Sequence, residues 1–199
     1  MVRGMGRLHR NEPESVSRGA AIVQAQCAWS GELSLGLHHA IRYDPAKADE
    51  LGREMQLTEH FSLEEFTHSS TAIALGIENT PTPEHMQNLQ DLAERMEGVR
   101  ALFNKLIEIT SAYRNPEVNA AVGGVPTSAH AVGHAADFHV HGMEDLDAAK
   151  VIRDSDLEFD QLIHEKNRCV HISFDPKMRQ QVLRQPGGPG SPVHPGLEP

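Results

Sequence analysis

The stretch SAHAVGHAAD, residues 128–137, is the part of the chain that decides the fold. It places His130 and Asp137 seven positions apart, with one glycine and small alanines between them. Because Gly133 permits a sharp turn, we expect His130 in a loop and Asp137 on the strand that follows. A third candidate, His171, lies in the apolar run CVHIS, which is typical of a buried strand. Two imidazoles and one carboxylate form a ligand set for a zinc ion that keeps its remaining position open, so these residues predict a zinc hydrolase.

The other histidines are weaker candidates, although the chain contains 13 in all. His139 and His141 alternate along the same expected strand and would share a face, but no carboxylate is spaced to join them. The pair His38 and His39 lies in a poorly patterned segment, and adjacent side chains diverge on a strand or a helix. The sequence contains no H-E-x-x-H motif, which is typical of helical metalloprotease sites.

Composition excludes several classes of protein. A chain of 199 residues is long enough for one domain with a core and additional segments. The formal net charge of -10 argues against binding to nucleic-acid phosphates. The 2 cysteines cannot form a disulfide framework, which favours a reducing compartment. We find no secretory signal and no apolar run near the roughly 20 residues of a membrane span, and we expect a monomer made in the cytoplasm.

The chain divides into three segments. Residues 1–54 are poorly patterned and are interpreted as a flexible extension or as a stretch upstream of a start at Met55. Residues 55–184 form the predicted domain. Residues 185–199 are rich in proline and glycine, which predicts a disordered tail.

Within the domain, helices come first and strands mostly later. Ser62 opens a capping box, Thr82-Pro83 begins a long amphipathic helix, and Asn115 caps a short helix that ends at two glycines. Strands are expected at 107–112, 135–140, 160–164 and 169–174, and a further helix at 144–154. This order predicts an α+β domain with a small antiparallel sheet packed with helices.

The pattern S-x-H-x-x-G-x-A-x-D, with a later V-H-x-S, resembles the zinc D-alanyl-D-alanine carboxypeptidase family, which includes D-Ala-D-Ala dipeptidases and phage L-alanyl-D-glutamate endolysins. The resemblance covers residues 55–183. It extends to LTEHFS from residue 57, ITSAYR from 109, Asn119, the glycines at 123 and 124, and FDQLI from 159. The chain is most similar to the small phage and prophage branch. The resemblance implies the hedgehog/DD-peptidase fold with zinc on the sheet.

This resemblance implies a role for each candidate residue. His130, Asp137 and His171 would be the zinc ligands. Arg114 would bind substrate or stabilise the transition state. Glu165 would be the general base, by analogy with a glutamate that precedes the last histidine in relatives, although in better-studied branches that acid lies closer to the histidine.

Other positions near the motif keep two interpretations. Ser128 would hydrogen-bond substrate or orient a ligand, or it would only cap the loop. Tyr113 would line the cleft or be a buried strand residue, and Asp160 is either a second candidate base or a turn residue. The family commonly has glycine at Ala112 and tryptophan at Cys169, and the cysteine leaves a thiol that could compete for zinc or oxidise.

Three functions stay open at this point. The first is a zinc peptidase that hydrolyses D-amino-acid-containing bonds of the peptidoglycan stem peptide, as a D-Ala-D-Ala carboxypeptidase or a cell-wall endopeptidase such as an endolysin. It would act in the periplasm or cell wall after phage-type release. The second is a catalytically inactive, zinc-containing wall-binding module of the same fold. The third is a metal-dependent amidase or other hydrolase with a different substrate, because one fold hosts many chemistries.

Overall fold

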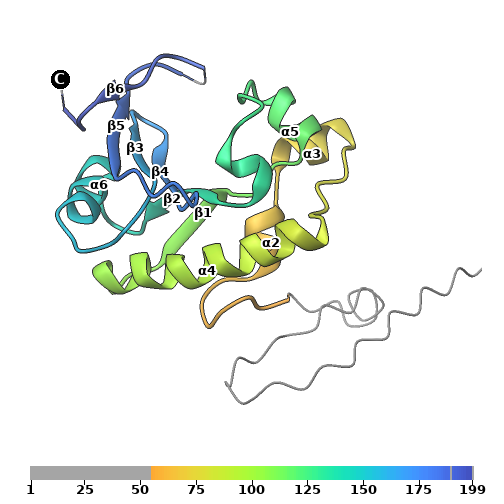
Figure 1. The fold of residues 1–199 in the computed structure, drawn as a ribbon, viewed down its shortest axis with the longest axis horizontal. Coiled ribbons are helices and arrows are strands. Elements are labelled where there is room, and N and C mark those ends of the chain that lie inside the picture. Colours follow the sequence, from red (N-terminus) through yellow and green to blue (C-terminus); the bar gives the residue numbers. More distant parts are fainter. Residues whose placement is uncertain (1–54, 189, 199) are drawn as a thin grey trace, which may run out of the picture. The chain divides into compact units, whose positions relative to one another are not determined.

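The computed structural model of this protein describes residues 55–188 and 190–198. The expectations for residues 1–54, including those for His38 and His39, lie outside the described residues. The elements follow one another along the chain as drawn in Figure 1: α2 (Leu63–Thr67), α3 (Ser70–Leu75), α4 (Pro83–Phe103), β1 (Ile107–Ser111), α5 (Pro116–Ala121), the short 3-10 helix η1 (Ala129–Val132), β2 (Ala135–Val140), α6 (Asp145–Arg153), β3 (Gln161–Glu165), β4 (Cys169–Ser173), β5 (Gln181–Gln185) and β6 (His194–Pro195).

The helix starts read from the sequence are confirmed. The Ser62 hydroxyl accepts a hydrogen bond from the Glu65 amide, and the Glu65 carboxylate accepts one from the Ser62 amide. The Thr82 and Asn115 side chains each accept one capping hydrogen bond, at α4 and α5, from the amide three positions on, and each has proline next in the chain. These bonds satisfy amides that a helix start leaves without a partner, so local residues alone set where the helices begin.

The six strands form a single mixed sheet in the order β1-β2-β4-β3-β5-β6. All neighbouring pairs are antiparallel except β3 and β5, which are parallel. The expectation of an antiparallel sheet is therefore corrected. The reason is topological. Strand β4 is antiparallel to β3 and therefore ends beside the start of β3, and the chain then crosses to the other side of β3 to begin β5 at that same end. Strand β5 consequently runs in the same direction as β3.

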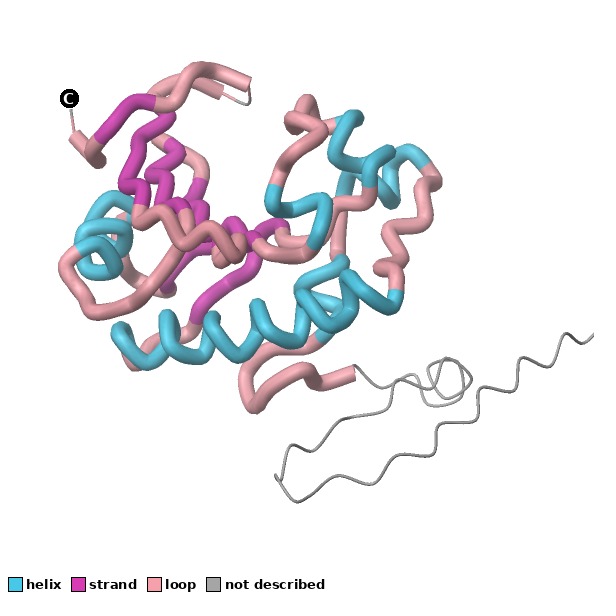
Figure 2. Tube along the Cα trace, viewed as in Figure 1, coloured by secondary structure: helices cyan, strands magenta, loops and turns pink. Residues whose placement is uncertain are grey.

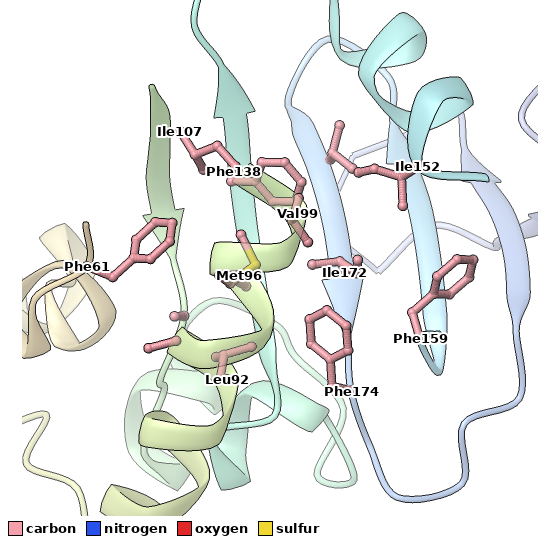
Figure 3. Close-up of a cluster of buried hydrophobic side chains, with 14 of the residues drawn as sticks. Phe61, Leu92, Met96, Val99, Ile107, Phe138, Ile152, Phe159, Ile172 and Phe174 are labelled. Atoms are coloured by element: carbon pink, nitrogen blue, oxygen red, sulfur yellow. The ribbon is translucent and has the colours of Figure 1, made fainter. Parts of the chain in front are cut away.

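One face of the sheet carries the hydrophobic core. Side chains alternate along each strand, so Phe138 and Ile172 face helix α4, while Asp137 and His171 face the opposite way. Figure 3 shows Met96 and Val99 of α4 beside Phe138 and Ile172. Figure 2 shows α4 running along one side of the strands. The polar face of β2 and β4 is thereby left for a site. Among the described helices, none is both long and apolar enough to cross a membrane.

The C-terminal segment differs from the disordered tail that its composition predicts. Its residues His194–Pro195 form strand β6, which pairs with β5. Leu197 is 4% exposed and belongs to the hydrophobic core. Glu198 forms an ion pair with Lys150 of α6. The segment is ordered despite its proline-rich and glycine-rich composition for two reasons. The edge of strand β5 provides backbone hydrogen-bond partners for β6, and the Leu197 side chain is buried in the hydrophobic core.

Candidate metal centre

The three predicted ligands lie together on the polar face of the sheet. Asp137 on β2 and His171 on β4 are register partners, and His130 comes from η1 just before β2. The Asp137 Oδ1 atom lies 3.1 Å from His130 Nε2 and 2.7 Å from His171 Nδ1. All three side chains are buried, and their ligand atoms lie within 4.8 Å of one another. The cluster joins donors from two strands and one turn that are up to 41 positions apart in the chain.

The local backbone orients His130. Its Nδ1–H donates a 2.6 Å hydrogen bond to the carbonyl of Ala112, which follows β1 directly, so the lone pair of Nε2 points to the centre. Gly133 ends η1 with φ of 80° and lets the chain turn into β2. A Cβ at this position would lie 3.2 Å from the His85 carbonyl oxygen. A larger residue would therefore be strained both by the positive φ and by this close contact.

Burial and the contacts between these side chains together set the protonation states at this centre. Burial lowers the pKa of His130, against the opposing effect of Asp137, and so favours the neutral imidazole. Burial would by itself raise the pKa of Asp137, but His130 and His171 hold it well below its usual range. Neutral imidazole and ionised carboxylate are the forms that bind zinc. The donor set therefore fits a zinc ion.

The lowered pKa of His130 predicts how the metal-free protein responds to pH. An unfolded histidine takes up a proton near pH ~6.5, whereas folded His130 resists it, so stability is complete above that pH and is lost as pH falls through it. We expect the unfolding free energy of the chelated protein to fall by up to about 1.4 kcal/mol per pH unit below this point. Because the pKa of Asp137 is also lowered, its contribution to stability is lost only below about pH 3.9, where an unfolded aspartate takes up a proton. Denaturant titrations between about pH 5 and 8 would show this slope, which His130→Asn should remove. A wild-type curve that stays flat in this range contradicts it.

Arg114 lies beside the metal ligands. Its Nη2 donates to Asp137 Oδ2 at 3.1 Å, and its backbone amide donates to the His130 carbonyl. The Nε atom is buried and has no partner among the described residues. Arg114 thus holds Asp137 from one side and brings a positive charge to the cavity that contains the three ligands.

Glu165 lies at the end of β3, and its carboxylate is within 4.8 Å of both the Asp137 carboxylate and the Cys169 sulfur. Its Oε2 atom accepts from Arg168 and from the Cys169 thiol, whereas Oε1 has no partner among the described residues. Burial and the carboxylates of Asp137 and Glu165 strongly raise the pKa of the Cys169 thiol. The thiol is therefore protonated and neutral beside the centre. Neither Arg168 nor the contact with Cys169 was foreseen from the sequence.

Asp160, the second candidate base, has a different partner. It is 1% exposed and accepts from the Arg179 guanidinium and backbone amide. These bonds, chiefly that of the guanidinium, lower the pKa of Asp160. It does not belong to the metal cluster, and its role in the structure is to anchor residue 179 at the end of the loop before β5.

The Asp160→Asn variant is therefore expected to be less stable than wild type but to retain its catalytic activity. Weakening hydrogen bonds to a charged group costs roughly 1–3 kcal/mol. We expect a lower melting temperature, with kcat within about threefold of wild type at a temperature where both are folded. A large fall in kcat with unchanged melting temperature would instead make Asp160 a catalytic acid or base.

The remaining candidates are placed as follows. Ser128 lines the cavity and its hydroxyl makes no capping bond, so the hydroxyl is available there. Tyr113 is 2% exposed and its hydroxyl contacts His85 Nδ1 at 3.0 Å, away from the cavity lining. His139 contacts Asp145 of α6 at 2.8 Å and is not part of the metal cluster. The structure thus brings Ser128 to the site and does not bring Tyr113.

The three candidate metal ligands, Arg114 and Glu165 line one cavity of about 970 Å³. Its lining also includes residues near the C-terminus, which the sequence does not indicate because their composition predicts disorder. A cavity of this size is at the upper end of the range for ligand sites. The arrangement is an acidic side chain with a free oxygen, a guanidinium and a His-Asp-His donor set in a shared hollow.

An α+β domain with this donor set at a cavity is typical of a metal-dependent hydrolase. The sequence matches the family model described as Peptidase M15 over residues 59–173, which is more than half of the chain. The protein therefore belongs to the peptidase M15 family, whose members are zinc-dependent peptidases. A comparison with curated proteins found no match.

Proposed function

We propose that this protein is a zinc peptidase that hydrolyses D-amino-acid-containing peptide bonds in the stem peptides of peptidoglycan. The observation that carries the proposal is the His130–Asp137–His171 donor set with Glu165 beside it, in a chain of the peptidase M15 family. The same membership supports the hedgehog/DD-peptidase fold, and we further propose a monomer that acts at the cell wall after phage-type release.

The chain's own residues suit peptide hydrolysis. His130, Asp137 and His171 would hold a zinc ion, which would supply Lewis acidity toward a carbonyl and toward water when bound. Glu165 has an oxygen free of protein partners, with which it accepts a proton from water and passes it to the leaving amine. Arg114 brings a fixed positive charge that stabilises the oxyanion formed at the attacked carbonyl.

The position of Glu165 also favours an enzyme over an inactive wall-binding module. The Glu165 carboxylate lies within 4.8 Å of Asp137, and its Oε1 atom makes no hydrogen bond with the described residues. A module that only retains a structural metal has no need for such a carboxylate. Structural zinc sites are commonly closed by four protein ligands, whereas catalytic sites have three. At this centre His130, Asp137 and His171 form one buried group of three, and Asp137 also lies within 4.8 Å of Glu165 and Cys169 in a second group.

The proposal is tested by metal analysis together with digestion of purified peptidoglycan and mass spectrometry of the products. One zinc per chain and new free amino groups at a D-amino-acid bond would support it. Zinc without release of any product would favour the wall-binding module. Cleavage of other amides with no action on peptidoglycan would favour a different hydrolase.

A further inference from the structure

The cavity at the metal centre has a second wall that is built by the C-terminal segment. Residues 190–193 line the same cavity as residues 122–125, which follow α5 on the other side. In Figure 1 the loop that leads into β6 and the loop after α5 both lie above strands β1 and β2 in the view. The family match ends at residue 173, so the second wall is formed by residues beyond the matched part. We call residues 190–193 the C-terminal wall.

Contacts with the domain hold this wall in place. Gln185 is 8% exposed, and its Nε2 donates to the Ser191 carbonyl at 2.8 Å. Arg184 donates to the Pro195 carbonyl at 2.6 Å. Beyond the wall, Leu197 is buried in the core. The wall is therefore anchored on both sides, by β5 before it and by β6 and Leu197 after it.

The charges in the cavity indicate which peptide it accepts. A carboxypeptidase must neutralise the free C-terminal carboxylate of its substrate, usually with an arginine or lysine. Among the described residues, each arginine and lysine that lines the cavity contacts a carboxylate: Arg114 with Asp137, Arg168 with Glu165, Lys177 with Asp175 and Arg179 with Asp160. Arg114 also has a buried Nε without a partner, but it lies beside the candidate metal ligands, where the oxyanion forms, and not at the C-terminal wall. The C-terminal wall itself, with sequence GSPV, carries no charge. The cavity is thus better suited to the neutral backbone of a continuing chain than to a chain end.

We propose that the C-terminal wall holds the substrate chain beyond the metal centre, so that this protein cuts internal bonds in preference to C-terminal ones. The inference rests on the proposed peptidase function and specifies its substrate as an extended peptide. The wall is a specificity-determining surface that contributes neither a candidate metal ligand nor the proposed base Glu165.

Two neighbouring glycines provide a matched test of the wall. A Cβ at Gly187 would lie 2.7 Å from Ser191 Cβ and 2.8 Å from its Oγ, so Gly187→Ala must displace the wall. A Cβ at Gly188 meets nothing within 4 Å, so Gly188→Ala is the control. Neither glycine has the positive φ that would strain an alanine.

The zinc-loaded proteins are compared on two peptides that contain the same D-amino-acid bond. In one peptide the bond is internal and the C-terminus is amidated; in the other the bond joins the last residue, which has a free carboxylate. We expect wild type and Gly188→Ala to favour the internal bond by about 10-fold or more in kcat/KM, and Gly187→Ala to lose about 10-fold on that peptide alone. Preference of wild type for the free carboxylate, or equal behaviour of the two alanine variants, overturns the inference.

A binding measurement separates failure of the inference from failure of the proposed function. Calorimetry with the amidated peptide is performed on zinc-loaded wild type and on both alanine variants, whether or not any of them hydrolyses it. Binding weakened in Gly187→Ala alone, without turnover, would support the wall while rejecting the peptidase function. Equal binding in all three proteins, or no binding in any, would reject the wall.

Discussion

The His130→Ala variant is expected to lose its zinc and to lose hydrolytic activity by about 10³-fold or more, because a metal contributes several kcal/mol of transition-state stabilisation. Removal of this imidazole leaves only Asp137 and His171 in the cluster. It also leaves the Ala112 carbonyl without the donor that it contacts at 2.6 Å. Elemental analysis after gel filtration and a peptidoglycan digestion assay measure the two losses.

His139→Ala is the matched control for this substitution. His139 is on the same strand as Asp137, but it contacts Asp145 and lies outside the metal cluster. We expect this variant to retain one zinc per chain and near wild-type activity. Full zinc occupancy in His130→Ala, or loss of zinc in His139→Ala alone, would contradict the assignment of the ligands.

The Glu165→Gln variant is expected to retain zinc while turnover falls by about 10²–10⁴-fold, the usual contribution of a positioned general base. Glutamine has nearly the same shape as glutamate but cannot accept the proton from water. His130, Asp137 and His171 form a group without this side chain, which belongs with Asp137 and Cys169 to a second, neighbouring group. Steady-state kinetics, with zinc content measured on the same samples, would show a low kcat at full occupancy.

The Arg168→Gln variant is the control for this substitution, because it removes the ion pair with Glu165 and leaves the Glu165 carboxylate in place. The Arg168 side chain is 40% exposed, and exposed pairs contribute about 0–1 kcal/mol. This variant retains the Glu165 carboxylate, so we expect kcat within a few-fold of wild type. If Glu165→Gln kept wild-type turnover, or if both variants lost the same large factor, Glu165 would not be the base.

The local sequence was sufficient for much of the secondary structure and for the three residues that the structure brings together as a candidate metal site. Ser62, Thr82 and Asn115 cap helices through bonds that span three positions, and such short-range chemistry can be read directly from the chain. His130 and Asp137 share one motif, and strand alternation with a glycine turn accounts for how they meet. The parallel pairing of β3 with β5 could not be read in this way, because it depends on the path of a connection between strands.

By itself, the sequence determined the α+β class, the helix starts and the choice of His130, Asp137 and His171 as candidate metal ligands, because each of these depends on residue type at a fixed short spacing or on motif resemblance. Only the tertiary structure decided that Tyr113 turns away from the cavity, that Asp160 is held by Arg179, and that residues 190–193 complete the cavity. The physical reason is that these outcomes depend on contacts between segments distant in the chain. Which of these side chains are buried, and which partners they contact, depends on how the strands and loops pack together, and a local sequence pattern does not contain that information.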